Sequence, residues 1–252
     1  MFQNDSNYLD QHFLIDDVII NKFIKICNLN NDDTVVEIGP GKGVLTKKII
    51  PQVKSLTLIE KDTRLKEYLD KLNVKVIYAN ILEVDIPKCN KIITALPYSI
   101  IEPFIYKLIN TDCNEIYMIM GSTYVNNCLN KEITNLSLLT NTYFEIEKYF
   151  DIAKECFYPM PKTLSSVIKL TKKKKFTSLD LIFKNLYELD NKKIKNALME
   201  AFININGITK KESIILVNNL NLKNELLEKK FSTISNIELK GLYKKISLNV
   251  KD

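Results

Sequence analysis

Three glycines at alternating positions follow an apolar segment and are the residues of this chain best placed to hold a nucleotide-like ligand. They form the motif Glu37-x-Gly39-x-Gly41-x-Gly43. A buried β-branched strand at 34–38 that runs into a glycine turn and a helix start at 45–50 lets backbone N–H groups approach a ligand closely, because no Cβ blocks the way. The dinucleotide fingerprint spaces its third glycine differently. We predict a nucleotide-type cofactor turn, and the alternative is a strand-to-helix turn that binds nothing.

A second acidic residue, Glu60, ends the next apolar strand at 56–59. The pattern E-x-G-x-G-x-G followed by an acid after the second strand resembles the S-adenosylmethionine turn of Rossmann-like methyltransferases. The resemblance implies S-adenosylmethionine as the cofactor and gives the second acid the task of accepting hydrogen bonds from the ribose hydroxyls.

Length and composition favour an ordinary intracellular protein. The 252 residues suit one large domain or one with a small appendage, and 46% hydrophobic residues can fill a core. No segment approaches the roughly 18 apolar residues of a membrane span, and the polar N-terminus is unlike a signal peptide. The 5 cysteines form no C-x-x-C pair and there is 1 histidine, so we expect no metal and no disulfide framework. We expect a cytoplasmic monomer.

Charge is distributed unevenly along the chain. Residues 1–170 carry 19 Lys and Arg against 21 Asp and Glu, whereas residues 171–252 carry 17 against 9. A basic C-terminal third favours a polyanionic partner such as RNA. The alternative is a lysine-rich solvated surface.

Alternating strand and helix patterns predict an α/β fold with a parallel, doubly wound sheet. Two further strands, at 142–150 and 165–171, are expected to finish this sheet in antiparallel fashion. Helical periodicity dominates after the lysine run at 172–175, including a basic helix at 192–203. We predict a Rossmann-like cofactor-binding domain at 1–171 and a small, basic, all-helical domain at 172–252.

Four further segments carry a more specific resemblance. They read Gln11-His12-Phe13-Leu14, Ala95-Leu96-Pro97-Tyr98, Phe157-x-Pro159-x-Pro161-Lys162, and Asn191-Lys192-Lys193-x-Lys195. In this order they resemble the KsgA-type rRNA adenine dimethyltransferases, whose relatives include the Erm rRNA methyltransferases. The similarity covers nearly the whole chain and is closer to archaeal and eukaryotic members than to Erm.

The resemblance implies transfer of two methyl groups to N6 of an adenine in small-subunit ribosomal RNA, with a precursor of that subunit as partner and a role in ribosome assembly. The exocyclic nitrogen is a poor nucleophile, so hydrogen-bond acceptors must hold it in line with the donor methyl while aromatic rings hold the extruded base. The residues implied for the base are Ala95, Leu96, Pro97, Tyr98 and Phe157. Those implied for the cofactor are Gln11, His12, Leu14, Glu37, Gly39, Gly41, Glu60, Lys61, Asn80, Ile81 and Ala95. Those implied for RNA are Lys162, Lys192, Lys193 and Lys195.

Two positions depart from the family pattern. Ala95 stands where the family has an Asn whose side chain accepts from N6, which leaves backbone carbonyls as acceptors. Asn80 stands where an Asp commonly accepts from the adenine amino group of the cofactor, and an amide oxygen can accept the same bond. The alternatives are an RNA-binding assembly factor that does not methylate, an Erm-like enzyme for large-subunit RNA, and a methyltransferase for small molecules or proteins.

Overall fold

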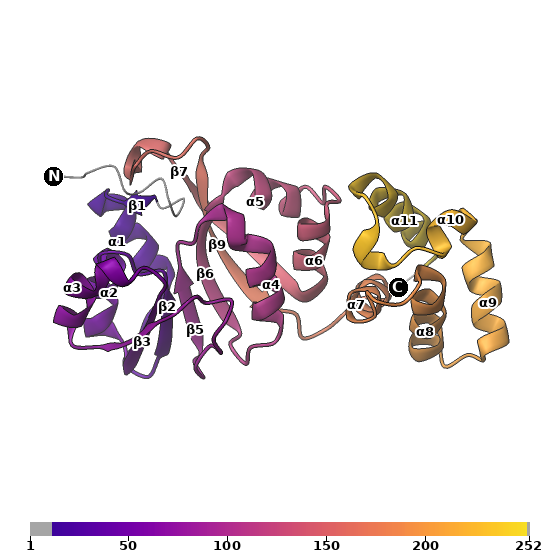
Figure 1. The fold of residues 1–252 in the computed structure, drawn as a ribbon, viewed down its shortest axis with the longest axis horizontal. Coiled ribbons are helices and arrows are strands. Elements are labelled where there is room, and N and C mark those ends of the chain that lie inside the picture. Colours follow the sequence, from indigo (N-terminus) through magenta and orange to yellow (C-terminus); the bar gives the residue numbers. More distant parts are fainter. Residues whose placement is uncertain (1–11, 251–252) are drawn as a thin grey trace. The chain divides into compact units, whose positions relative to one another are not determined.

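The computed structural model describes residues 12–250, apart from the side chain of Tyr98. These residues form two compact units (Figure 1). The first contains the described residues up to 126 together with 146–172, and the second contains 127–145 together with the residues from 173 onward. The functional domains at 1–171 and 172–252 stay a prediction, and the compact units add residues 127–145 to the C-terminal part.

The larger sheet among the described residues has seven strands, in the order β4-β3-β2-β5-β6-β9-β7. Their bounds are β2 (Thr34–Ile38), β3 (Ser55–Glu60), β4 (Lys75–Tyr78), β5 (Lys91–Thr94), β6 (Glu115–Gly121), β7 (Phe144–Ile152) and β9 (Ser165–Lys172). The strands β2 to β6 are parallel, and β9 is antiparallel to β6. The predicted α/β fold with its parallel core is therefore confirmed.

The helices of this region are α1 (Asp17–Ile26), α2 (Val44–Ile49), α3 (Lys66–Leu69), α4 (Ile101–Ile109) and α5 (Ser122–Leu129). The helix α1 begins where the Asp16 side chain accepts from two backbone N–H groups, and it buries Phe23 completely. Alternate strand residues such as Leu58 and Ile93 share one core with α1 and α2. Burial of both sheet faces explains the near-continuous apolar strands.

The second unit is helical. Its elements are α6 (Asn135–Tyr143), α7 (Ser178–Glu188), α8 (Ile194–Asn206), α9 (Lys210–Asn219), α10 (Asn224–Leu227) and α11 (Asn236–Asn249). Capping boxes at Thr134, Thr177, Thr209 and Ser235 fix the starts of four of these helices. Tyr187 packs edge-on against Phe231 in the core, with ring centroids 4.9 Å apart. Among the residues from 12 to 250, no helix is long and apolar enough to cross a membrane.

The strand predicted at 142–150 and the helix predicted at 192–203 both lie further along the chain, at 144–152 and 194–206. The strand expected from 142 begins at 144, because α6 continues to Tyr143 and the Thr142 hydroxyl bonds back to Leu138 within that helix. The helix expected from 192 begins at 194, with Lys193 as its extended N-cap residue.

Candidate active site

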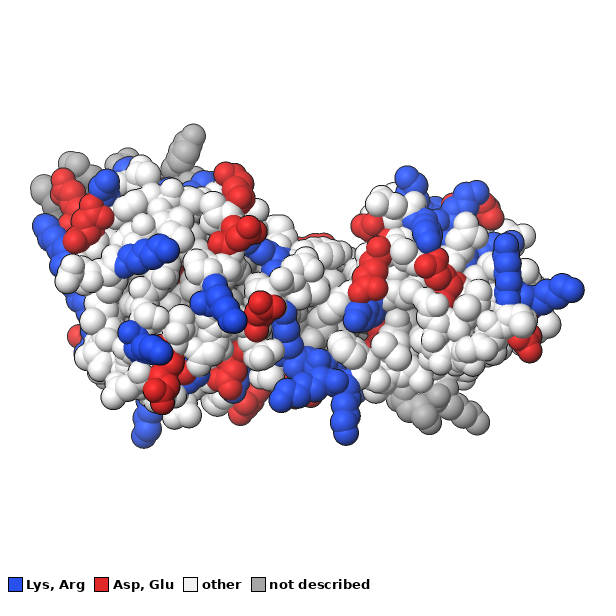
Figure 2. Space-filling model, turned by 90° about the horizontal axis from the view of Figure 1, so that it is seen from below, with Lys and Arg blue, Asp and Glu red and all other residues white. Residues whose placement is uncertain are grey.

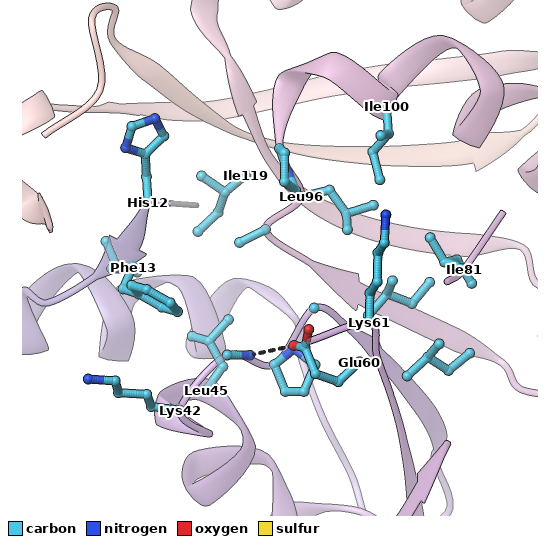
Figure 3. A pocket seen from close by; sticks show the side chains of 18 of the residues that line it. His12, Phe13, Lys42, Leu45, Glu60, Lys61, Ile81, Leu96, Ile100 and Ile119 are labelled. Atoms are coloured by element: carbon cyan, nitrogen blue, oxygen red, sulfur yellow. Dashed lines mark hydrogen bonds between the residues drawn. The ribbon is translucent and has the colours of Figure 1, made fainter. Parts of the chain in front are cut away.

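A cavity of about 510 Å³ lies at the carboxyl ends of the parallel strands. Its walls come from the glycine turn after β2, from Glu60 and Lys61 after β3, and from the segments after β4 and β5 (Figure 3). In doubly wound sheets ligands bind at this edge, and the volume lies within the range for small-molecule sites. The fold therefore assembles one pocket from residues that are far apart in the sequence.

The glycine turn has the backbone that the sequence predicts. Gly39, Gly41 and Gly43 have φ angles of 68°, 58° and 76°, all in the left-handed region. A Cβ on Gly41 would lie 3.0 Å from the ring of Phe13, and one on Gly43 would lie 2.7 Å from Leu72. A side chain is thus unfavourable at both positions, because the φ angles are left-handed and the Cβ would crowd a neighbouring side chain. The turn brings the backbone of Gly39 and Gly41 to the cavity wall.

The carboxylate of Glu60 fixes this turn from the neighbouring strand. One oxygen accepts from the N–H of Gly41 at 3.2 Å and the other from the N–H of Asp62 at 2.8 Å, and Figure 3 shows the first of these bonds. Burial raises the pKa of Glu60 above its ordinary value, although the backbone N–H groups oppose that shift. A carboxylate has about four lone-pair positions, so Glu60 keeps accepting capacity at the cavity wall.

Glu37 is buried beneath the glycine turn and is not among the described residues that line the cavity. Its Oε2 accepts from the Thr46 hydroxyl at 2.7 Å, whereas its buried Oε1 has no hydrogen-bond partner among the described residues. Complete burial raises the pKa of Glu37 to about 8; the Thr46 bond opposes the shift and the charge of Glu60 adds to it. A buried oxygen without a hydrogen-bond partner beside the glycine turn marks this region as a candidate functional site.

Asn80 follows the carboxyl end of β4, and its neighbours Ala79, Ile81 and Leu82 also line the cavity. The Asn80 amide nitrogen donates to Glu83 at 2.8 Å, and its oxygen accepts from the N–H of Leu82 at 3.2 Å. The backbone N–H of Glu83 closes the same turn onto the carbonyl of Asn80 at 2.9 Å. The segment is therefore a hydrogen-bonded turn in the wall of the cavity.

The segment after β5 forms another wall. Ala95, Leu96 and Pro97 line the cavity, and Leu96 is buried. Ala95 contributes a methyl group where an amide would provide an acceptor. The carbonyl of Pro97 accepts from Ile100 at 3.3 Å, which closes the short 3₁₀ turn Tyr98–Ile100. The side chain of Tyr98 lies outside the described part of the structure, so its stacking role stays a prediction.

The N-terminal arm is attached to the loop that carries Phe157. The strands β1 (Phe13–Leu14) and β8 (Phe157–Tyr158) pair antiparallel, with Leu14 opposite Phe157. The ring Nδ1 of His12 donates to the carbonyl of Pro159 at 2.7 Å. His12, Leu14 and Phe157 all line the cavity, so two segments more than 140 residues apart close the same side of it. Gln11 lies outside the described residues, and its predicted contact stays a prediction.

The predicted RNA-binding lysines lie apart from this cavity lining. Lys162 is exposed in the loop after β8. In the second unit Lys192 pairs with Glu200 and Lys193 with Glu228, each at 2.6 Å, and Lys195 is half-buried. Both ion pairs are exposed, so each contributes little to stability.

Twelve lining residues were missed by the sequence reasoning. They are Phe13, Ile38, Pro40, Lys42, Val44, Leu45, Ile59, Ala79, Leu82, Ser99, Ile100 and Ile119. All of them except Ile119 lie inside one of the motifs or within two residues of a motif or a predicted site residue, so extending each motif by one or two residues would have found them. Ile119 reaches the cavity from the interior of β6, and its apolar strand gives no signal that distinguishes it from core.

The fold and the cavity together define a Rossmann-like methyltransferase. The crystal structure of a dimethyladenosine transferase from Plasmodium falciparum has a TM-score of 0.65 at 19% identity, and covers 94% of this chain and 98% of its own. The crystal structure of the 23S rRNA methyltransferase ErmE has a TM-score of 0.61 at 19% identity, and covers 93% of this chain and 99% of its own. At this identity both comparisons support the fold alone.

The sequence comparisons identify the family. The model of the ribosomal RNA adenine dimethylase family matches residues 2–238. A probable ribosomal RNA small subunit methyltransferase A from Methanococcus aeolicus is 30% identical over 95% of this chain and 97% of its own length. A ribosomal RNA small subunit methyltransferase A from Malacoplasma penetrans is 34% identical over 68% and 67%. The chain belongs to the ribosomal RNA adenine dimethylase family, and the resemblance inferred from its motifs is confirmed.

Proposed function

We propose that this protein uses S-adenosylmethionine to dimethylate N6 of an adenine in small-subunit ribosomal RNA. The observation that carries the proposal is the cavity at the carboxyl ends of the strands, where Glu60, Asn80, the 95–97 segment and Phe157 meet. The names of the two relatives described above support the same reaction. Because those relatives are named as methyltransferases, the alternative of a non-methylating assembly factor gains no support.

The cavity fits the cofactor in chemistry as well as in volume. Glu60 offers carboxylate oxygens for two adjacent ribose hydroxyls, and Asn80 offers an amide oxygen for an adenine amino group. Ile81 and Leu82 supply apolar contacts for a purine ring, and Lys61 lies beside Glu60 at the wall. The backbone of Gly39 and Gly41, with His12 and Leu14, would enclose the amino-acid end. Bound S-adenosylmethionine supplies a methyl group on a positively charged sulfur.

Glu37 has an indirect part in this assignment. Its hydrogen bond to Thr46 links the end of β2 to α2, on the two sides of the glycine turn. We therefore assign Glu37 to holding the turn in place beneath the cofactor.

Other residues of the cavity wall suit an extruded adenine. Phe157 offers an aromatic face, Pro97 stiffens the wall, and Tyr98 is the second predicted stacking ring. Stacking of a base on an aromatic side chain contributes about 1–3 kcal/mol in other nucleic-acid sites. With Ala95 in place of an amide, the N6 protons are left to backbone carbonyls of the 95–98 segment. These acceptors favour the pyramidal nitrogen of the transition state over the planar ground state.

The second unit supplies charge for the RNA. Residues 171–252 carry nearly twice as many basic as acidic side chains, and Figure 2 shows both kinds on the face it presents. Lys192, Lys193 and Lys195, with Lys162 of the first unit, are assigned to phosphate contacts that position the substrate without reading its sequence.

A methyl-transfer assay with three kinds of substrate tests the proposal. Radiolabelled methyl groups from S-adenosylmethionine should enter unmethylated small ribosomal subunits and leave naked large-subunit RNA and total protein unlabelled. Label in large-subunit RNA alone would establish the Erm-like alternative. If none of the substrates acquired label although the same protein preparation bound S-adenosylhomocysteine, the enzymatic proposal would be contradicted.

A further inference from the structure

The amide of Asn80 is held in one orientation by two neighbours of opposite kind. Glu83 presents a carboxylate, which only accepts, to the amide nitrogen at 2.8 Å. Leu82 presents a backbone N–H, which only donates, to the amide oxygen at 3.2 Å. Turning the amide over would put oxygen against carboxylate and nitrogen against N–H. Both contacts would then be repulsive.

This orientation matters because an amide, unlike a carboxylate, has a donor face and an acceptor face. An unrestrained Asn can turn its nitrogen toward a ligand as readily as its oxygen. The adenine amino group donates, so it requires the oxygen. The oxygen of Asn80 accepts one neutral hydrogen bond within the turn and keeps a second lone pair for a ligand.

Glu83 itself stands outside the lining of the cavity and is exposed. It reaches Asn80 because the two residues are the first and fourth of one turn, closed by a backbone hydrogen bond of 2.9 Å. The bond from an amide to a carboxylate is charge-assisted and is stronger than the neutral contact from Leu82. Of the two restraints on the amide, the one from Glu83 is therefore the stronger.

We propose that Glu83 is a positioning residue for cofactor specificity: its carboxylate locks the Asn80 amide with the oxygen toward the ligand, so that the site selects a purine with a 6-amino group. The inference rests on the proposed function, because it concerns the adenine end of the same cofactor site. With its amide held by Glu83, three residues later, Asn80 presents only an acceptor to the ligand, as a carboxylate does.

The test measures the contribution of the amino group to binding, by calorimetry on the full chain. The ligands are S-adenosylhomocysteine and its analogue in which hydrogen replaces the 6-amino group, which leaves the ring nitrogens unchanged. For wild type the analogue should bind about 10-fold more weakly, the loss expected for one hydrogen bond. In Glu83→Ala the penalty should shrink to about threefold or less, through weaker binding of S-adenosylhomocysteine and unchanged binding of the analogue.

Two further variants separate orientation from charge and folding. Glu83→Gln can turn its own amide oxygen to Asn80 and should restore most of the wild-type penalty. Asp85→Ala removes a nearby exposed charge outside this hydrogen bond and should leave the penalty at its wild-type value.

Three results would overturn the inference. They are a full penalty in Glu83→Ala, an equal loss of affinity for both ligands in that variant, or no penalty in wild type. Failure of wild type to bind S-adenosylhomocysteine at all would instead refute the proposed cofactor, and the inference with it.

Discussion

Replacing Glu60 by Gln should weaken cofactor binding strongly while leaving the protein folded. Glu60 holds the N–H groups of Gly41 and Asp62 and offers its remaining lone pairs to the cavity. A glutamine has the same size but only one accepting atom, so its NH₂ group must face either a backbone N–H or a ribose hydroxyl. The change removes the charge and one acceptor at once.

The magnitude follows from the hydrogen bonds that are lost. A hydrogen bond to a charged group contributes about 1.5–3 kcal/mol net, and a neutral one about 1 kcal/mol. Exchanging two charge-assisted bonds to the ribose for one neutral bond costs about 2–5 kcal/mol, which corresponds to a roughly 30- to 5,000-fold rise in Kd.

Isothermal titration calorimetry with S-adenosylhomocysteine measures this change directly. Glu67→Gln is the matched control, because Glu67 is an exposed acid on α3 outside the cavity lining and should leave Kd unchanged. A Kd for Glu60→Gln within threefold of wild type, in protein with a cooperative unfolding transition, would refute the assignment of Glu60 to the ribose.

Four further predictions concern the same site. Ala95→Asn should raise the methyl-transfer rate by as much as about 100-fold, since one preorganised transition-state hydrogen bond contributes on this scale. Gly41→Ala should lower the free energy of unfolding by about 1–3 kcal/mol, since its φ of 58° is left-handed and its Cβ would crowd Phe13. Phe157→Leu should raise KM for RNA with little change in the Kd of S-adenosylhomocysteine, because the ring is assigned to the base. Glu37→Gln should flatten the dependence of stability on pH. Burial raises the pKa of Glu37 from its ordinary value of 4.5 to about 8, so its contribution to the free energy of unfolding is full below pH 4.5 and is lost as pH rises through 8. Between pH 5 and 8 the free energy of unfolding of wild type should therefore fall on the order of 3 kcal/mol more than that of the variant.

Each of these has a contrary outcome. Unchanged rates for Ala95→Asn would show that backbone carbonyls suffice. Unchanged chemical denaturation of Gly41→Ala would mean that the turn tolerates a side chain. Loss of cofactor binding in Phe157→Leu would place the ring on the cofactor, and parallel stability profiles for Glu37→Gln and wild type would show that Glu37 titrates normally.

Local sequence patterns were sufficient to predict the sheet and the glycine turn. The apolar strands and the three glycines specify their conformations through burial and backbone freedom, and these depend on short segments. The motif segments also pointed to Ala95, Leu96, Pro97 and Phe157, which line one cavity in the structure, while their roles stay predictions.

Local sequence patterns could not predict the contacts between segments that are far apart in the sequence. The pairing of β1 with β8 and the bond from His12 to Pro159 join segments with no shared periodicity. The position of Glu37 beneath the turn was missed because a carboxylate in a strand has the same spacing whether it faces a ligand or a helix. The partnership of Asn80 with Glu83 depends on a turn that only the structure shows.

Mass spectrometry of the nucleosides from treated ribosomal RNA tests the central claim most directly. Unmethylated small subunits incubated with this protein and S-adenosylmethionine should yield N6,N6-dimethyladenosine, and heat-inactivated protein should yield none. Digests that contain only unmodified adenosine, after incubation with folded protein that binds S-adenosylhomocysteine, would contradict the account.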